Sequence, residues 1–288
     1  MKRNYAPLVQ PGDTGLPTAT QLSGAVGAGI IPLTNGYTLN VAFNKPPAEN
    51  VKVSLPPAQG DQSLQAVMNT GGNAIGGKYN PVNNTVEARL NSSETLTVRE
   101  RRMDFGDIAN KSREMQNAIN VLASKGIING TSPTTFNPDG RINRAEIAAL
   151  ITRTLSKYDA NADGRFTDVT RSNWFFGAVG SARRHEIMRG TSDTIFSPMV
   201  NIPKDQIVAV SARVLRNEMR YRDPSNISGV LSTYTDAGAI PEWARIDVAL
   251  ATRENLVVRR TDGAFNGTAT MTRGEAALIL YRMFMKIW

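Results

Sequence analysis

Residues 103–288 contain one pattern three times, and this internal repeat constrains the fold more than any other feature of the sequence. Each copy has an aromatic residue with Asp two positions later, a Phe about 30 residues further on, a cation eight residues after that Phe, and Glu or Gln two residues beyond the cation. The positions are Phe105, Asp107, Phe136, Arg144 and Glu146; Phe166, Asp168, Phe196, Lys204 and Gln206; and Tyr234, Asp236, Phe265, Arg273 and Glu275.

Each copy predicts a pair of helices. The first helices are expected at 115–124, 175–184 and 244–253. The second helices should begin at Asn143, Pro203 and Thr272, because Asn and Thr cap helix N-termini and Pro suits the first helical position. One helix pair cannot bury its apolar stripe alone. We therefore expect the second helices to form a central three-helix bundle with pseudo-threefold symmetry.

Residues 1–102 read as β structure, because apolar and polar residues alternate in several short runs. The predicted strands are 37–43, 51–55, 85–90 and 95–98, separated by Gly, Pro and Asn turns. The expected fold class is therefore α+β and multidomain, with a small β-sandwich-like, Ig-like spacer domain at 1–102. The three mainly helical repeats should occupy 103–160, 161–222 and 223–288.

Composition excludes much enzyme chemistry. The chain has no Cys and a single His, His185, so thiolate sites and sites that need two imidazoles are absent from the sequence. No catalytic constellation and no cofactor motif is present, which favours a non-enzymatic role. The formal net charge of +8 favours an anionic partner, such as nucleic acid, a lipid surface or an acidic polysaccharide. No nucleic-acid-binding motif accompanies that charge.

The apolar stretch at 22–33 is too short to span a bilayer and lies too far from Lys2 and Arg3 to form a signal peptide. We therefore expect a chain that is not embedded in a membrane and carries no export signal of its own. The protein is then either cytoplasmic or a fragment of something longer, and the rest of the sequence favours the fragment.

Three cations fall in the first turns of the predicted second helices: Arg144, Lys204 and Arg273. The helix dipole disfavours a cation there, whereas the backbone N–H groups that an isolated helix leaves free favour an anion. A misfit repeated three times indicates a shared task. One interpretation is contact with an anionic ligand, and the other is a salt bridge to a neighbouring repeat. Trp174 and Trp243 occupy one slot in two copies and could stack on sugar or pack in the core.

The segments 126–130, 136–140 and 142–146, with sequences GIING, FNPDG and INRAE, resemble the S-layer homology repeat. The resemblance implies a three-pronged module at the C-terminus of a bacterial cell-surface protein. It would bind secondary cell-wall polysaccharide, commonly through a pyruvate ketal on N-acetylmannosamine. The implied ligand-binding residues are Arg144, Lys204, Arg273, Trp174, Trp243, Gly130 and Gly190, and the implied structural residues are Glu146, Gln206, Glu275, Phe136, Phe196 and Phe265.

The copies depart from the family pattern at several positions. Glu114 stands in the Trp slot of the first copy, Gln206 replaces the motif Glu in the second, and Arg259 replaces a turn Gly in the third. The three sites are therefore not expected to be equivalent. An alternative role is assembly with other surface-layer subunits without direct glycan binding.

Two further acidic patterns are present. Asp107, Asp168 and Asp236 are expected to cap the loops that enter the first helices. Asp159, Asn161 and Asp163 imitate the first half of a calcium loop, but position twelve is Thr170 rather than Glu. This makes them a weak calcium candidate, and a solvated turn is the preferred interpretation.

Overall fold

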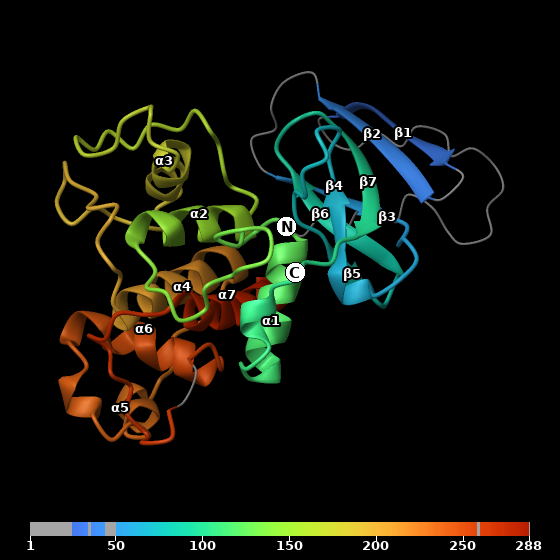
Figure 1. The fold of residues 1–288 in the computed structure, drawn as a ribbon. Helices are drawn as coiled ribbons and strands as arrows, with labels where there is room; N and C mark the ends of the chain where they lie inside the picture. The colour runs from blue at the N-terminus through green and yellow to red at the C-terminus, as the bar shows by residue number, and fades with distance from the viewer. Residues whose placement is uncertain (1–24, 34–35, 44–49, 258–259, 288) are drawn as a thin grey trace. The chain divides into compact units, whose positions relative to one another are not determined.

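A computed structural model describes residues 25–33, 36–43, 50–257 and 260–287. The chain forms two compact units. The first holds the described residues up to Asp104 together with Asn120–Asn129, and the second holds Phe105–Ile119 and the described residues from Gly130 onward. Strands belong to the first unit and most helices to the second, so the predicted α+β composition is confirmed (Figure 1).

The first unit contains two antiparallel sheets (Figure 1). One sheet has the order β1-β2-β7-β4 and the other β3-β6-β5. Side chains from both sheets form one apolar core, including Leu39, Val53, Val86 and Leu96. The strands are β1 (Ala25–Leu33), β2 (Gly36–Phe43), β3 (Val51–Leu55), β4 (Gln65–Met68), β5 (Lys78–Asn80), β6 (Thr85–Leu90) and β7 (Glu94–Glu100).

The four predicted strands are confirmed as β2, β3, β6 and β7. The apolar stretch near the start becomes β1, which pairs with β2 over most of its length. The sequence analysis missed β4 and β5. β5 has only three residues, too few for alternation to be detected, and β4 begins with the buried Gln65 and has no alternation of apolar and polar residues.

The first unit also includes the segment Asn120–Asn129, the end of the first helix and the turn after it. The Gly76 amide donates to the Lys125 carbonyl at 3.1 Å, and Arg101 donates to the carbonyl of Ala123. The Lys125 side chain is 2% exposed and its ammonium donates to the Gln65 carbonyl. This segment of the first repeat is therefore held by the β structure.

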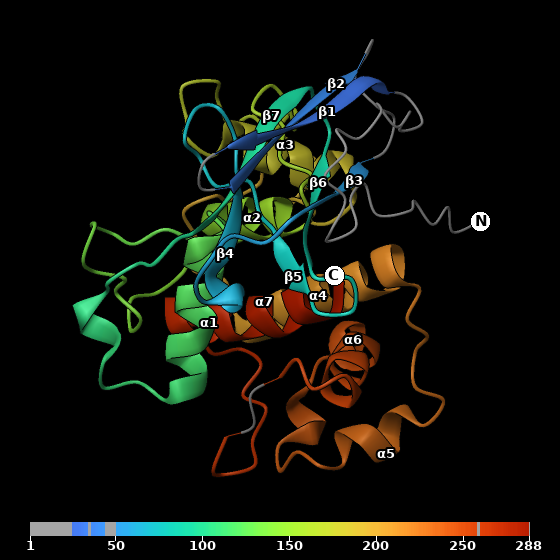
Figure 2. The ribbon, with the colours of Figure 1, turned by 90° about the vertical axis from the view of Figure 1, so that its right-hand side faces the viewer.

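Helix α7 packs against both α4 and α2, and Figures 1 and 2 show α7 beside α4. Helix α3 packs against α2, and α6 packs against both α4 and the short α5. The helices are α1 (Arg113–Ser124), α2 (Arg144–Thr154), α3 (Phe176–Arg184), α4 (Lys204–Met219), α5 (Ile227–Leu231), α6 (Glu242–Arg253) and α7 (Arg273–Ile287). In the part of the chain that the structure describes, no helix has the length and apolarity to cross a bilayer.

The predicted helix starts agree with the structure except at one residue. Asn143 caps α2 in a capping box with Glu146, and Thr272 with Glu275 exchanges the same two bonds before α7. Pro203 was predicted as the first helical residue of α4. This was wrong, because it is extended (φ −75°, ψ 158°) and forms the N-cap, with α4 beginning at Lys204.

Candidate functional site

In each repeat an aspartate holds the loop that follows the recurring Phe. The two carboxylate oxygens of Asp107 accept hydrogen bonds from the Phe136 and Asn137 amides at 2.9 and 2.6 Å. Although burial alone would raise the pKa of Asp107, these two bonds lower it. The same two bonds join Asp168 to Phe196 and Ser197, and Asp236 to Phe265 and Asn266.

The prediction that these aspartates cap the loops entering the first helices was therefore wrong. The carboxylates bind a segment about 30 residues further along the chain. We call each pair of aspartate hydrogen bonds a clamp. The aromatic residue two positions before each aspartate contacts the recurring Phe, with ring centroids 5.4 to 5.7 Å apart. The clamp and the ring contact together fix the backbone of each Phe, and this matters because its carbonyl receives the next contact.

The recurring cation of one repeat binds the Phe of another. Arg144 of the first repeat donates to the Phe196 carbonyl at 2.9 Å, and its guanidinium lies 4.7 Å from the centroid of that ring. Lys204 of the second repeat binds the carbonyl and ring of Phe265 in the third, and Arg273 of the third binds those of Phe136 in the first. The contacts form a closed cycle. We name the Arg144–Phe196, Lys204–Phe265 and Arg273–Phe136 contacts the first, second and third junctions.

The backbone amides that begin the second helices are also used at the junctions. Arg144 and Ala145 donate to the carbonyls of Val200 and Pro198 at 3.0 and 2.9 Å. Equivalent pairs of bonds begin α4 and α7. The expectation of free N–H groups at these helix starts was therefore wrong, because the neighbouring loop already accepts from them.

The junctions differ in what else surrounds the cation. At the first, Arg144 is 6% exposed and also donates to Gln206 Oε1 at 2.9 Å and to the Arg189 carbonyl at 2.7 Å. At the third, Arg273 forms a salt bridge of 2.9 Å with Glu146. The structure thus contains, at the third junction, the salt bridge between repeats that the sequence left open as an alternative to ligand contact.

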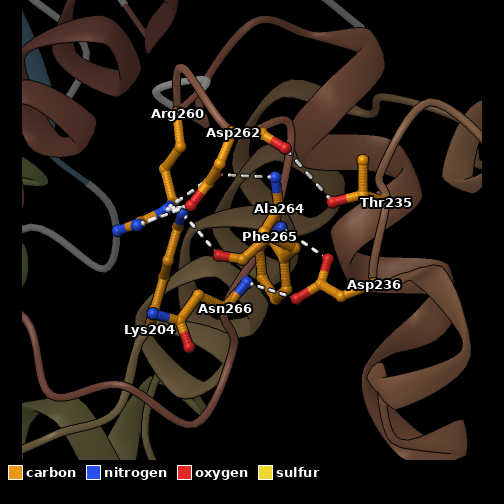
Figure 3. A network of polar contacts seen from close by, with 8 residues as sticks. All are labelled: Lys204, Thr235, Asp236, Arg260, Asp262, Ala264, Phe265 and Asn266. Atoms are coloured by element: carbon orange, nitrogen blue, oxygen red, sulfur yellow. Dashed lines mark hydrogen bonds and ion pairs between the residues drawn. The ribbon is translucent and has the colours of Figure 1, made fainter.

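The second junction is the network drawn in Figure 3. Lys204 donates to the Phe265 carbonyl at 2.8 Å, and burial is the main cause that lowers the pKa of its ammonium. Nearby, Arg260 pairs with Asp262 at 2.8 Å. The charge of Arg260 lowers the pKa of Lys204 further, whereas that of Glu275 raises it. This junction therefore contains both signs of charge.

Asp205 follows Lys204 and is buried without a full set of partners. Its side chain is 5% exposed, and Oδ1 has no hydrogen-bond partner among the described residues. The facing loop has Gly267 where the other repeats have Pro138 and Pro198, and a Cβ on Gly267 would lie 3.4 Å from that of Asp205. The Asp205 side chain thus lies beside a glycine that leaves room for it, and burial raises the pKa of its carboxyl.

We expect Asp205→Asn to stabilise the second unit at pH 7 by about 1–2 kcal/mol, because an amide has no charge to desolvate. Since the folded-state pKa of Asp205 lies above its ordinary value of 3.8, the folded state binds more protons than the unfolded state above that pH, and stability falls as pH rises through this window. Urea unfolding followed by Trp fluorescence at pH 4 and pH 7 checks this. The exposed Asp193→Asn is the matched control, and a variant that gains equally at both pH values would contradict the argument.

A cavity of about 230 Å³ lies at the first junction. It brings together Arg144, Gly190 and Trp243 of the predicted ligand-binding residues, with Gln206 of the predicted structural ones. Trp243 is 56% exposed. The remaining lining residues are Met188, Arg189, Thr191, Ile202, Ala209, Val210 and Arg213.

The other predicted ligand residues lie elsewhere. Lys204 and Arg273 are at the second and third junctions, and Trp174 is 59% exposed with its ring edge-on to Phe175 at 5.3 Å. Gly130 has no room for a side chain, because a Cβ would lie 2.4 Å from the Ser132 carbonyl oxygen. Gly190 is equally confined, 2.3 Å from the Ser192 carbonyl oxygen, so both glycines are required by packing.

The sequence analysis missed Arg213, which lines the cavity and donates to the Ile187 carbonyl at 2.7 Å. Its counterparts are Arg153 and Arg282, and each of the three lies nine residues after a motif cation. Arg282 also donates to the turn after the first helix of its own repeat, at the Val257 carbonyl (3.1 Å), one position beyond the counterpart of Ile187. The signal was present as a seventh recurring position in the aligned copies.

The calcium candidate forms turns in the structure. Asp159 accepts from the Asn161 amide and pairs with Arg184 at 2.7 Å, and Asp163 accepts from the Arg165 amide. These are the bonds of solvated Asx turns. Across the described residues, no group of three or more His, Cys, Asp or Glu side chains is placed to hold a metal ion.

Comparison with known proteins matches the family model "S-layer homology domain" to residues 104–148, 165–202 and 233–277. The chain carries three S-layer homology domains. The first and third matches run from the loop-binding aspartate through the junction cation, whereas the second begins before Asp168 and ends at Ile202, two residues before Lys204.

Relatives that contain similar segments include surface proteins and polysaccharide-degrading enzymes. The chain is 29% identical to an amylopullulanase from Thermoanaerobacterium thermosulfurigenes over 74% of its length, and 27% identical to the exoglucanase XynX of Acetivibrio thermocellus over 66%. It is 28% identical over 62% of its length to the surface-layer 125 kDa protein of Lysinibacillus sphaericus. These matches span only 11, 17 and 14% of the relatives, so they cover a minor part of each.

Proposed function

We propose that the three S-layer homology domains hold an exported protein on the bacterial cell surface by binding cell-wall polysaccharide without covalent attachment. The observation that carries the proposal is the cavity at the first junction, where an exposed Trp meets the buried Arg144 and the half-buried Arg213. Similar segments in a surface-layer protein and in enzymes of different activities support a shared anchoring role rather than a shared reaction.

In the proposed complex, Trp243 packs against the apolar face of a sugar ring, and the arginines bind an acidic substituent. A pyruvate ketal fits this chemistry, because its carboxylate can accept charge-assisted hydrogen bonds from a guanidinium. Arg144 already uses three N–H groups within the protein, so its remaining donors and those of Arg213 would face the ligand. The helix N-termini supply no amides to it.

The proposal extends to the whole described chain as a module without catalysis. Residues 1–102 act as a β-sandwich-like spacer, and the repeats at 103–160, 161–222 and 223–288 form a pseudo-threefold trimer around α2, α4 and α7. The cycle of three junctions and the packing of α7 on its two neighbours support this arrangement.

Trp243→Ala tests the proposal. We expect the parent chain to bind purified wall polysaccharide in a sedimentation or calorimetric assay, and Trp243→Ala to bind about tenfold more weakly, a loss of about 1.4 kcal/mol. Trp243 is more than half exposed, so its removal should leave the fold intact. The matched control is Trp174→Ala, which removes an equally exposed Trp outside the cavity.

Polysaccharide stripped of pyruvate separates the finer part of the proposal from the coarser. Weaker binding of the stripped polymer would assign the acidic group to the ketal, whereas equal binding would assign it to another substituent. Absence of binding by the parent to any wall polymer would contradict the anchoring role and favour assembly with other surface subunits.

A further inference from the structure

The charged residues that line the cavity at the first junction are all cations. Three arginines line it, Arg144, Arg189 and Arg213, and no Asp or Glu does. Among the described residues, none of the three forms an ion pair. Burial lowers the pKa of both Arg144 and Arg213, and Arg189 lowers that of Arg213 further.

Two acids lie behind this lining, and both are committed elsewhere. The charge of Asp168 raises the pKa of Arg144, but the Asp168 carboxylate oxygens accept hydrogen bonds from the Phe196 and Ser197 amides. The charge of Asp247 raises the pKa of Arg213, but the Asp247 carboxylate forms its ion pair with Arg216, at 2.5 Å. Neither carboxylate lines the cavity, so a ligand there contacts arginines and no acidic side chain.

The other junctions have their own acids at the matching positions. Glu146, the counterpart of Gln206, neutralises Arg273 in a salt bridge of 2.9 Å at the third junction. At the second junction, the charge of Glu275 raises the pKa of Lys204. Arg282, the counterpart of Arg213, forms an ion pair with Glu114 at 2.6 Å. The first junction differs because residue 206 is Gln, whose amide oxygen accepts from Arg144 without neutralising it.

We infer that the cavity at the first junction selects a glycan segment with two negative charges over one with a single charge, and that Gln206 sets this selectivity. The inference rests on the proposed function and names the charge class of its ligand. The three cations line one cavity of about 230 Å³, and Arg189 lowers the pKa of Arg213, as repulsion between like charges does. A monoanion relieves part of that repulsion, and a dianion relieves more of it.

Three monosaccharides of the same ring size test the charge dependence: glucose, glucuronate with one negative charge, and glucose 6-phosphate with nearly two at pH 8. Binding to the parent chain is measured by NMR titration of the Trp243 indole. We expect glucose 6-phosphate to bind at least tenfold more tightly than glucuronate, and glucose not to bind measurably. In Gln206→Glu the advantage of the phosphate should fall below threefold.

The variant is expected to fold, because the third junction already accommodates an Arg–Glu pair at the equivalent position. Gln62→Glu makes the same chemical change at an exposed residue of the other unit, outside the cavity lining, and should leave all three titrations unaltered. Equal affinities for glucuronate and glucose 6-phosphate, or a Gln206→Glu variant that behaves as the parent, would overturn the inference.

The same proteins are then tested on purified wall polysaccharide. A polymer that binds parent and Gln206→Glu equally would overturn the inference and leave the anchoring role standing. A phosphate preference that depends on Gln206, in a chain that binds no wall polymer, would uphold the inference and contradict the anchoring role. The two failures are therefore distinguishable.

Discussion

Replacing Arg144 by alanine is expected to lower the free energy of unfolding of the second unit by about 3 kcal/mol. The guanidinium is nearly fully buried, donates to two backbone carbonyls and Gln206, and covers the ring of Phe196. Its removal leaves the carbonyls of Phe196 and Arg189 without this donor in a buried site. Urea unfolding followed by Trp fluorescence measures the loss.

Arg141→Ala is the matched control for this prediction. Arg141 lies three residues earlier, is exposed, and donates to the Thr270 carbonyl, so its loss should cost less than 1 kcal/mol. Similar losses in the two variants would show that the junction contributes little to stability. Because we expect Arg144→Ala to destabilise the repeats, alanine substitution of the junction cations cannot by itself separate ligand contact from folding, whereas Gln206→Glu can.

Lys125→Met is expected to stabilise the first unit by about 2–3 kcal/mol at pH 6. Burial lowers the pKa of Lys125 to about 7, and the field of Asp61 compensates only in part. The fall from 10.5 sets an upper limit of about 5 kcal/mol on the cost of keeping this ammonium charged in the folded state. The gain is smaller because Met leaves the Gln65 carbonyl without the lysine donor.

The pH dependence identifies the mechanism. Between pH 7 and 10.5 the unfolded state binds the proton that the folded state has lost, so the stability of the parent should rise with pH in this window. Scanning calorimetry from pH 6 to 9.5 should show that rise in the parent and not in Lys125→Met. Lys52→Met, which removes a half-exposed lysine of the same unit, should retain the rise. A parent stability that is flat over this range would contradict the burial of a charged lysine.

The repeat pattern predicted most of the helices because the same polar and aromatic residues recur at fixed spacing. It could not predict where the aspartates would bind, since a carboxylate can bond any nearby amide, and the closest amides in the fold belong to the loop about 30 residues later. The second helix of the third repeat was predicted from Thr272 and its Glu275, whereas the short α5 has too few residues to show a period.

Predicting the site required knowledge of which repeat contacts which. Arg144 and Trp243 are almost one hundred residues apart and belong to the first and third repeats, yet they line one cavity. Within a single copy, the substitution of Gln206 for Glu reads as the loss of a motif residue. Its effect on charge appears only when Gln206 is placed beside Arg144 of another copy.

Closure of the cycle has a consequence for how such chains can change over evolutionary time. Each repeat contributes one cation and one Phe carbonyl to the cycle, and Arg273 of the last repeat donates to the Phe136 carbonyl of the first. Deletion of one copy by recombination would leave a cation without its carbonyl and a carbonyl without its cation. The inherited unit is therefore the triplet, within which single positions such as residue 206 are free to diverge.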